Sequence, residues 1–263
     1  MPEIALWSEE LRGREVTEVV AGSSLRNRPW EERSPGLVCG ITVASAGTFS
    51  LGAVREDEVV ESYSRLGEAL GFGLVAVPYQ VHGCDVVRVA AERARAGAPL
   101  ACVEVSFSGR CDGLVTGDTD LLLASTAADC VPVYLLDPGT RSIGLVHAGW
   151  RGVAGGILER GLERLCEGRA LRHRVRVHLG PAICGACYEV DRPVLDRFGV
   201  DAERARLDLR GILVSQALRA GVQESHITVS RHCTSCGETD LHSHRASGGQ
   251  AGRMAAFVGF RVI

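Results

Sequence analysis

The stretch 128–152 constrains the fold of this chain more strongly than any other segment. The apolar run 131–136, Val-Pro-Val-Tyr-Leu-Leu, is followed by an Asp137-Pro138-Gly139 turn and a second strand-like run that reaches His147. Cys130 stands directly before the first run, and a glycine-rich turn, His-Ala-Gly-Trp-Arg-Gly, begins at His147. Short apolar runs between turn residues are typical of buried strands. The stretch therefore predicts two buried strands with a thiol and an imidazole at their edges.

These two side chains are candidate metal ligands. A cysteine thiolate and a neutral imidazole suit Zn²⁺ or a softer metal, and one further ligand would complete a three-ligand site with an open position. His82 is the third candidate. Cysteine is often buried for packing alone. The glycine turn after His147, together with Asp129 beside Cys130 and Arg151 within the turn, favours chemistry at this place.

Composition limits the class of protein and of partner. The chain has 263 residues, of which 46% are hydrophobic and 23% charged, as expected for one globular domain. Its formal net charge of −3 argues against nucleic acid or an anionic membrane as partner. Lysine is absent, so a lysine Schiff base and a Walker lysine are excluded.

The sequence favours a cytoplasmic protein. Ten cysteines in a chain of this length are too sparse for a small secreted disulfide scaffold, and the start, Met-Pro-Glu-Ile, lacks the layout of a signal peptide. The longest apolar stretch, 121–136, is interrupted by Asp129 and Pro132 and falls short of the roughly 20 residues that a membrane span needs.

Periodicity along the chain alternates between strands and helices. The segment 1–36 is polar and is expected to be a peripheral N-terminal segment, with a single domain over 37–263. The expected helices are 56–70, one from the 149–152 turn to 166, and one after Asp208; the expected strands include 121–126, 131–136, 175–179, 227–230, and a pair, 74–81 and 85–90, joined by a turn at His82-Gly83. This mixture predicts a mixed α/β or α+β domain.

Two Cys-x-x-Cys pairs, Cys184 with Cys187 and Cys233 with Cys236, are alternative metal ligands. The 45 residues between the pairs exceed the roughly 15–20 that are typical of compact zinc ribbons. We therefore expect packed thiols and not a shared zinc ion. The Gly-x-Ser-x-Gly elbow, the Gly-x-Gly-x-x-Gly fingerprint and the P-loop are all absent.

Taken in order, the motifs of the chain resemble those of one family, the laccase-domain family of YfiH-type bacterial proteins. The motifs that carry the resemblance are Gln80-Val81-His82-Gly83, Cys111-Asp112-Gly113-Leu114-Val115-Thr116, Ala128-Asp129-Cys130-Val131-Pro132-Val133, His147-Ala148-Gly149-Trp150-Arg151-Gly152, Gly180-Pro181-Ala182-Ile183, Cys187-Tyr188-Glu189-Val190, Cys233-Thr234-x-Cys236, Ser243-His244-Arg245 and Gly252-Arg253-Met254-Ala255. The family was first described as polyphenol oxidases and later assigned purine nucleoside phosphorylase and adenosine deaminase activity.

The resemblance implies a fold, a metal and substrates. The implied fold is α+β, a single-domain α/β/β/α-type sandwich with mixed sheets. The implied cofactor is Zn²⁺, held by His82, Cys130 and His147, and the implied partners are a small-molecule nucleoside and phosphate. Copper is the less favoured metal, because a blue-copper centre with a trinuclear cluster needs more clustered histidines than eight scattered ones. A non-catalytic, zinc-stabilised binding module is a further alternative.

The motifs also suggest roles for individual residues. The expected catalytic residues are Cys130, His147, Asp129 and Arg151. The expected substrate-binding residues are Gln80, Asp112 and Arg245. Phosphorolysis needs a cation for phosphate and a proton donor for the departing purine, for which Arg151 and Asp129 or Asp112 are the nearest candidates by motif.

Two departures from the family pattern concern the substrate pocket. The family's Ser-Thr-Arg-x-Gly-Gly segment is replaced by Thr42-Val-Ala44-Ser-Ala-Gly47, so Ala44 stands where an arginine is usual. Because a guanidinium is a good clamp for phosphate, we expect deamination to be kept relative to phosphorolysis. The family's adjacent cysteines before Tyr188 become Ala186-Cys187, with Cys184 displaced upstream.

Overall fold

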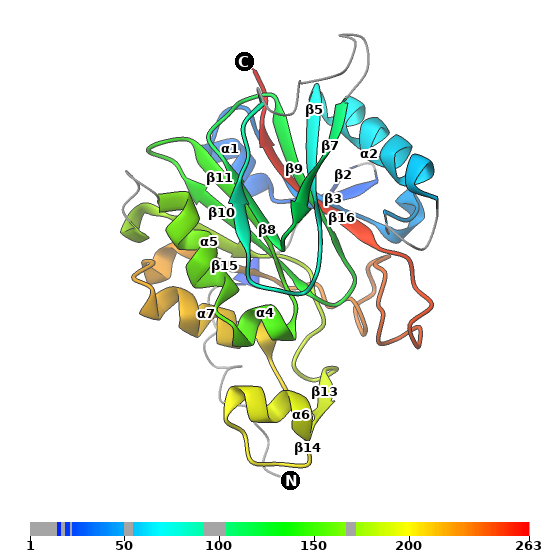
Figure 1. Ribbon diagram of the computed structural model, residues 1–263, viewed down its shortest axis with the longest axis vertical. Helices are drawn as coiled ribbons and strands as arrows, with labels where there is room; N and C mark the ends of the chain where they lie inside the picture. Colours follow the sequence, from blue (N-terminus) through cyan, green and yellow to red (C-terminus); the bar gives the residue numbers. More distant parts are fainter. Residues whose placement is uncertain are drawn as a thin grey trace.

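The longest apolar stretch of the sequence, 121–136, forms most of two strands, β9 (Leu121–Ala127) and β10 (Val131–Asp137), which lie in different sheets. The computed structural model describes residues 15–16, 19–21, 23–49, 55–91, 104–166 and 172–262. Within these ranges, two seven-stranded sheets face each other and helices cover their outer sides (Figure 1). The short link 128–130 carries the chain from one sheet to the other.

Both sheets are mixed, with parallel and antiparallel neighbours. In order across it, the first sheet contains β1 (Glu15–Val16), β15 (Ile227–Ser230), β12 (Arg176–Leu179), β10, β11 (Ser142–Ala148), β8 (Gly113–Thr116) and β6 (Val86–Arg88). The second contains β2 (Val19–Ala21), β3 (Ser24–Arg26), β4 (Leu37–Thr42), β16 (Met254–Phe260), β9, β5 (Leu74–Tyr79) and β7 (Glu104–Arg110). A separate hairpin pairs β13 (Glu189–Asp191) with β14 (Arg204–Arg206).

In the described part of the chain, the longest helices are α2, α5 and α7, with 15, 10 and 11 residues. The α-helices are α1 (Arg28–Arg33), α2 (Glu56–Leu70), α4 (Trp150–Ala154), α5 (Ile157–Cys166), α6 (Arg192–Leu195) and α7 (Leu209–Arg219), and the 3₁₀ turns are η2 (Ala44–Ala46), η3 (Arg172–Arg174), η4 (Asp196–Phe198) and η5 (Glu224–His226). None of the helices in the described part of the chain is long and apolar enough to cross a membrane.

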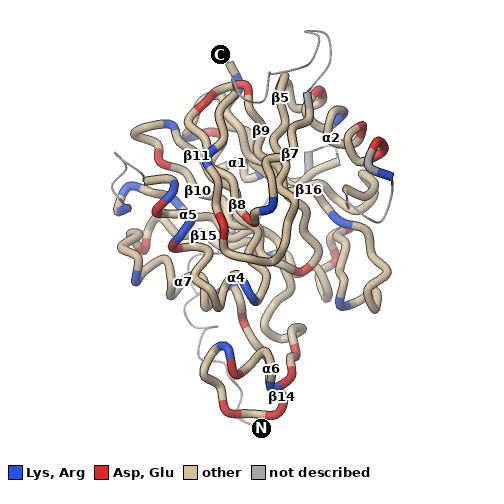
Figure 2. Tube along the Cα trace, in the orientation of Figure 1, with Lys and Arg blue, Asp and Glu red and all other residues tan. Residues whose placement is uncertain are grey.

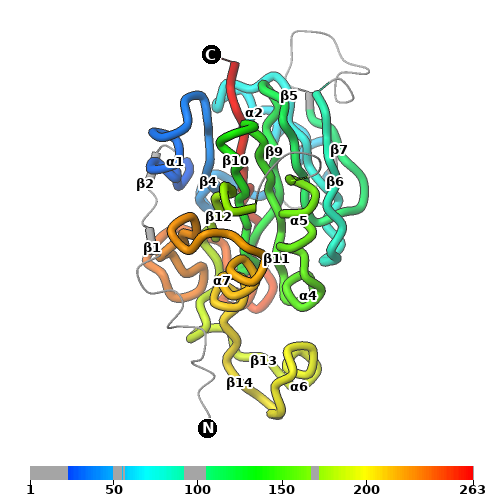
Figure 3. The backbone as a smooth tube through the Cα atoms, turned by 90° about the vertical axis from the view of Figure 1, so that its left-hand side faces the viewer, coloured from blue at the N-terminus to red at the C-terminus, as the bar shows by residue number. Residues whose placement is uncertain are grey.

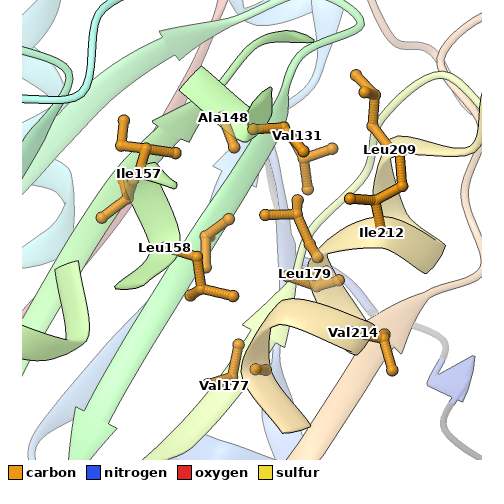
Figure 4. Close-up of a cluster of buried hydrophobic side chains, with 14 of the residues drawn as sticks. Val131, Ala148, Ile157, Leu158, Val177, Leu179, Leu209, Ile212 and Val214 are labelled. Carbon is orange, nitrogen blue, oxygen red and sulfur yellow. The ribbon is translucent and has the colours of Figure 1, made fainter. Parts of the chain in front are cut away.

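Three apolar layers hold the sandwich together. Alternate residues of β10 point to opposite sides of the sheet. Val131, Val133 and Leu135 pack under α5 and α7. Tyr134 and Leu136 pack between the two sheets. Figure 4 shows the first of these layers, with Leu158 of α5 and Ile212 of α7 over the sheet. Helix α2 covers the other sheet with a third layer. The order of layers is therefore α/β/β/α, and the predicted fold class is confirmed.

Local signals set the ends of several elements as expected. Helix α2 has the predicted bounds and ends at Gly71, whose φ of 75° suits a helix C-terminus. Helix α7 begins after Asp208, whose carboxylate accepts hydrogen bonds from the backbone N–H groups of Arg210 and Gly211 at 3.1 and 3.2 Å. The helix expected over 149–166 is instead two helices, because the Gly155-Gly156 pair interrupts it.

One predicted strand pairing is wrong. Strands β5 and β6 were expected to pair around His82-Gly83, but β5 pairs with β7 and β9 in one sheet and β6 pairs with β8 in the other. The segment between β5 and β6 is therefore a crossover between the sheets and not a hairpin turn. Pairing partners depend on contacts distant in sequence, which the local alternation of residues does not reveal.

The described part of the predicted peripheral segment 1–36 lies at the sheet edges. It provides strands β1 to β3 and helix α1, and its Leu25 and Trp30 are buried between the sheets. The segment formed by β13, α6 and β14 projects from the sandwich in both views (Figures 1 and 3). Residues of both charges lie on this projection (Figure 2), where Arg192 pairs with Glu203.

A hydrogen bond between the two sheets gives a test of their packing. The buried Tyr134 hydroxyl of β10 donates to the carbonyl of Gly40 in β4 at 2.8 Å. Tyr134→Phe leaves that buried carbonyl without this donor, so we expect a loss of about 1–3 kcal/mol in the free energy of unfolding, measured by urea denaturation.

Tyr63 of α2 provides the matched control. Its side chain is also fully buried, but its hydroxyl has no hydrogen-bond partner among the described residues. Tyr63→Phe should therefore leave stability unchanged or raise it. Equal losses in the two variants would contradict the importance of the inter-sheet bond.

Candidate metal centre

The candidate site lies where the chain passes three times between the sheets. The crossovers are 80–85 between β5 and β6, 111–112 between β7 and β8, and 128–130 between β9 and β10. They carry His82, Asp112 and Cys130 respectively. His147, near the end of β11, lies opposite Pro132 in the antiparallel ladder with β10 and so comes beside Cys130. Neighbouring strand ends therefore bring together residues that are far apart in sequence.

The three predicted metal ligands meet at this place. The ligand atoms of His82, Cys130 and His147 all lie within 4.8 Å of one another. The two imidazole rings stand edge to face, with centroids 4.9 Å apart and an angle of 83° between their planes. His147 is buried, Cys130 is half-buried and His82 is exposed, so the group forms a site with one side open to solvent.

The backbone at two of the crossovers adopts left-handed conformations. His82 has a φ of 57° and Asp129 a φ of 84°, values that non-glycine residues rarely adopt and that cost of order 1–3 kcal/mol. Surrounding hydrogen bonds hold both residues in place. The backbone N–H of His82 donates to Asp112, and the carboxylate of Asp129 accepts three hydrogen bonds.

Asp112 positions two of the ligands. Its carboxylate accepts hydrogen bonds from the backbone N–H groups of Val81, His82 and Gly83 at 3.2, 2.9 and 2.7 Å, and it lies 3.0 Å from Nδ1 of His147. Burial favours the neutral acid, but the bonds from His147 and Gly83 outweigh burial and hold the pKa of Asp112 below its usual value. The carboxylate therefore fixes Nδ1 of His147 and leaves Nε2 for a metal.

The thiol and the imidazole are electrostatically coupled. Burial alone would raise the pKa of Cys130, but the neighbouring His147 and His82 lower it to about 6. Burial would likewise lower the pKa of His147, but the Cys130 thiolate and the Asp112 carboxylate raise it to about 9. The site thus stabilises a thiolate at neutral pH, which is the form of cysteine that binds metals.

These residues fit a zinc ion. One thiolate and two imidazoles are zinc ligands, and three protein ligands leave a position for a further group. Gly149 provides the space beside them: a Cβ atom there would lie 3.2 Å from both Cys130 Sγ and His82 Cδ2. A side chain at this position would crowd the ligands.

A cavity of about 780 Å³ opens onto the three ligands. This volume lies within the range of pockets for small molecules, roughly 300–1,000 Å³. Its wall also includes the side chains of Tyr79, Gln80, Arg110, His244 and Arg253. The cavity thus combines a metal-binding group, aromatic surface and positive charge.

Two predicted site residues make hydrogen bonds within the protein and are not among the residues that line the cavity. Asp112, expected to bind substrate, is 0% exposed and hydrogen-bonded within the protein, so it has no surface to offer a ligand. Asp129, expected to be catalytic, accepts bonds from the hydroxyls of Thr234 and Ser243 at 2.6 and 2.7 Å and from the N–H of Arg245 at 2.7 Å. Both are positioning residues in this structure.

The other predicted residues lie around the site. Gln80 lines the cavity, and its side-chain amide pairs with the backbone of Thr126 at 2.9 and 2.8 Å, which fixes the loop to β9. Arg151 lies over the ring of Trp150 at 4.3 Å. Arg245 donates to the carbonyl of Glu189 at 2.6 Å. Neither arginine is among the residues that line the cavity.

Sequence reasoning missed Arg253, which does line the cavity. It precedes β16, and its guanidinium donates to the carbonyls of Ala251 and Gly252 at 2.8 and 2.9 Å and lies 3.4 Å from Nδ1 of His244. Both residues belong to motifs that carried the family resemblance. Their place in those motifs was the available signal, and it gave no indication of which cavity they face.

The four cysteines of the two Cys-x-x-Cys pairs also converge. The ligand atoms of Cys184, Cys187, Cys233 and Cys236 all lie within 4.8 Å of one another. The sequence analysis expected packed thiols and used the 45 residues between the pairs as an argument against a shared site. That argument fails, because sequence distance does not limit the approach of two loops at neighbouring strand ends.

The chain is similar to proteins of one known family. The family model described as multi-copper polyphenol oxidoreductase laccase matches residues 39–261. The chain belongs to this laccase-domain family. The resemblance predicted from the motifs is therefore confirmed.

The matches to individual relatives extend over most of the chain. It is 37% identical to purine nucleoside phosphorylase YlmD of Geobacillus stearothermophilus, over 86% of this chain and 91% of that protein. It is 32% identical to adenosine deaminase RL5 from an unknown prokaryotic organism, over 74% and 79%. The crystal structure of YlmD from Geobacillus stearothermophilus matches with a TM-score of 0.79 at 33% identity, covering 94% of this chain and 100% of that one. The Bacillus licheniformis hypothetical protein YfiH also gives 0.79, at 28% identity, over 92% and 97%.

The ligand assignment predicts which side chains hold the metal. Cys130→Ala and His147→Ala should each lose the metal from this site, because two remaining protein ligands bind zinc too weakly. Metal content of the purified variants, measured by plasma mass spectrometry, tests this. Cys166→Ala, which removes a half-buried thiol at the end of α5, is the control and should retain the metal. Full occupancy in Cys130→Ala would refute the assignment.

The hydrogen bond between Asp112 and His147 predicts that a substitution at Asp112 weakens metal binding without abolishing it. Asp112→Asn replaces the charged acceptor of the His147 Nδ1–H and should weaken metal affinity roughly 10- to 100-fold, measured by competition with a chromophoric chelator. Asp85→Asn removes an exposed carboxylate from the same crossover and should leave the affinity unchanged. Circular dichroism checks that both variants fold. An unaltered affinity in folded Asp112→Asn would show that the carboxylate does not orient the ligand.

Proposed function

We propose that this protein is a zinc-dependent enzyme that acts on purine nucleosides, by phosphorolysis of adenosine or inosine, by deamination of adenosine, or by both. The observation that carries the proposal is the convergence of His82, Cys130 and His147 at a cavity large enough for a nucleoside. The names of the relatives, purine nucleoside phosphorylase and adenosine deaminase, support the same substrate class.

Zinc is the metal that we propose for the site, although the description of the family model names copper. A multi-copper oxidase needs several adjacent metal sites built mainly from histidines. In the described parts of the chain, the groups of three or more close metal-binding side chains are this trio and the four cysteines. When bound, a zinc ion supplies Lewis-acid chemistry at the open end of the trio.

Residues of the cavity wall provide the means to bind a nucleoside and an anion. Tyr79 stacks on Phe107 with ring centroids 4.8 Å apart and is 38% exposed, so its ring can contact a purine base. Arg253 and Arg110 bring positive charge to the same cavity, as phosphate requires. His244, beside Arg253, can transfer a proton to a departing base.

The two reactions use these residues differently. Deamination adds water to adenosine and releases ammonia and inosine, so it requires no anion site. Phosphorolysis breaks the bond between the base and the ribose, forms ribose 1-phosphate and returns a proton to the base. It depends on a bound phosphate and hence on Arg253 or an equivalent cation.

The replacement of the family arginine by Ala44 bears on the balance between these reactions. Ala44 begins η2, and the segment that follows it packs beside Arg253: the N–H of Arg253 donates to Thr48 Oγ1 at 3.1 Å, and the N–H of Phe49 donates to the Arg253 carbonyl at 3.0 Å. The missing guanidinium thus belongs to the segment next to Arg253. With one cation fewer, phosphate binds more weakly than with both.

This reasoning predicts that phosphate saturates the enzyme only weakly. Ala44→Arg should strengthen phosphate dependence more than it changes deamination, and Arg253→Ala should lower the phosphate-dependent rate roughly 10- to 150-fold, the effect of about 1.5–3 kcal/mol from one charge-assisted contact. Chromatography of inosine and adenine formed from adenosine at varied phosphate measures both reactions.

Arg65→Ala, at an exposed position on α2, is the control and should leave both rates unchanged. Strong phosphorolysis that saturates at low phosphate and survives Arg253→Ala would show that other residues hold the anion. Absence of both products from metal-loaded protein, with oxidation of phenols after copper loading, would overturn the proposed function.

A further inference from the structure

We propose that Cys184, Cys187, Cys233 and Cys236 bind a second zinc ion in a structural site distinct from the His82, Cys130 and His147 centre. All four sulfur atoms lie within 4.8 Å of one another, and those of Cys184 and Cys236 are 3.9 Å apart. In a tetrahedral Cys₄ site with Zn–S distances of about 2.3 Å, the sulfur atoms are about 3.8 Å apart. The four side chains are thus close to the arrangement that zinc requires.

The sheet explains how pairs separated by 45 residues meet. Strands β12 and β15 are parallel neighbours, and each leads at its carboxyl end into one Cys-x-x-Cys segment. The pairing continues past the strands: Ala182 and Cys233 form a parallel bridge, and the N–H of Thr234 donates to the Ala182 carbonyl at 3.2 Å. Carboxyl ends of adjacent parallel strands meet at one edge of a sheet, so the two pairs are held face to face.

Each pair is held in a tight turn that presents both sulfur atoms on the same side. The carbonyl of Cys184 accepts from the N–H groups of Cys187 and Tyr188, both at 3.0 Å. The carbonyl of Cys233 accepts from the N–H of Gly237 at 3.1 Å, and a Cβ atom on Gly237 would lie only 2.4 Å from that carbonyl oxygen. Glycine is thus required directly after the second pair.

Backbone donors surround one of the sulfur atoms. Sγ of Cys233 accepts hydrogen bonds from the N–H groups of Cys184, Ser235 and Cys236 at 3.3, 3.4 and 3.5 Å. Such donors stabilise the charged thiolate, which is the form that binds zinc. Several thiolates at this distance repel one another, and a divalent cation removes the repulsion. Cys236 is exposed, which gives the ion a route into the site.

The site has a consequence for the neighbouring metal centre. Both cysteine-bearing segments contact Asp129, the residue before Cys130: the hydroxyl of Thr234 donates to its carboxylate at 2.6 Å, and the N–H of Ile183 donates to its carbonyl at 3.1 Å. A zinc ion that joins the two segments therefore also fixes the left-handed backbone of Asp129. The second site would therefore hold in place the loop that carries Cys130.

Metal analysis of the full-length protein tests the proposal. After zinc loading and gel filtration, the wild type should hold two zinc ions. Cys236→Ser and the double variant Cys233→Ser/Cys236→Ser should each hold one, whereas Cys130→Ala should lose the other and retain the Cys₄ ion. Cys166→Ser is the matched control and should hold two. One zinc ion in the wild type that persists in the double variant would overturn the proposal.

Cobalt loading provides a second readout, because the wild type and Cys130→Ala both keep the four cysteines and need no serine substitution. Co²⁺ bound by four thiolates gives strong sulfur-to-metal charge-transfer absorption, which should largely persist in Cys130→Ala. In Cys236→Ser it should fall to the weaker absorption that the single Cys130 thiolate of the other centre gives. Intact mass of the unreduced protein distinguishes the redox alternative, since each disulfide lowers the mass by two hydrogens. Disulfides among these four cysteines in protein purified with zinc present would also refute the site.

Discussion

The hydrogen bonds of the buried Asp112 carboxylate organise the metal centre and the strand ends around it. This one group accepts from three consecutive backbone N–H groups of the His82 loop and contacts the ring of His147 on another strand. A buried carboxylate is costly unless each oxygen is satisfied, so the loop and the ring are held to a single arrangement. The ligands are thereby placed before any ion arrives, which reduces the conformational entropy that metal binding must overcome.

Local signals in the sequence predicted the elements well where local forces decide them. Helix α2 follows from the spacing of Val59, Tyr63 and Leu66 and from Gly71 at its end, and the buried strands β9 and β10 follow from runs of mostly apolar residues. The pairing of β5 with β7 and β9 was not predictable in this way. A pattern of apolar residues indicates that a strand is buried, but it does not indicate which strand pairs with it.

In the candidate site, too, the sequence indicated the features that depend on residue type and local context, but not those that depend on contacts distant in sequence. Cys130 and His147 were selected as candidate ligands because their residue types and glycine-rich surroundings suit a metal, and the third candidate was His82; the fold brings the three side chains together. Asp112 and Asp129 were expected to bind substrate or to take part in catalysis, but both carboxylates accept hydrogen bonds within the protein. Sequence alone does not distinguish an acidic residue that faces a cavity from one that faces the interior. Arg253, more than a hundred residues from the ligands in sequence, reaches the cavity only through the sheet order that places β16 next to β9.

The three crossovers tie the occupancy of the metal centre to the docking of the two sheets. Because the His82, Asp112 and Cys130 segments each leave one sheet and enter the other, sliding or separation of the sheets changes the spacing of the ligands. Any ion that binds only the docked form stabilises it by linkage, by about 2.7 kcal/mol when free metal exceeds its dissociation constant roughly 100-fold. A metal ion held at the candidate site would therefore make the resistance of this protein to heat depend on the free metal concentration around it.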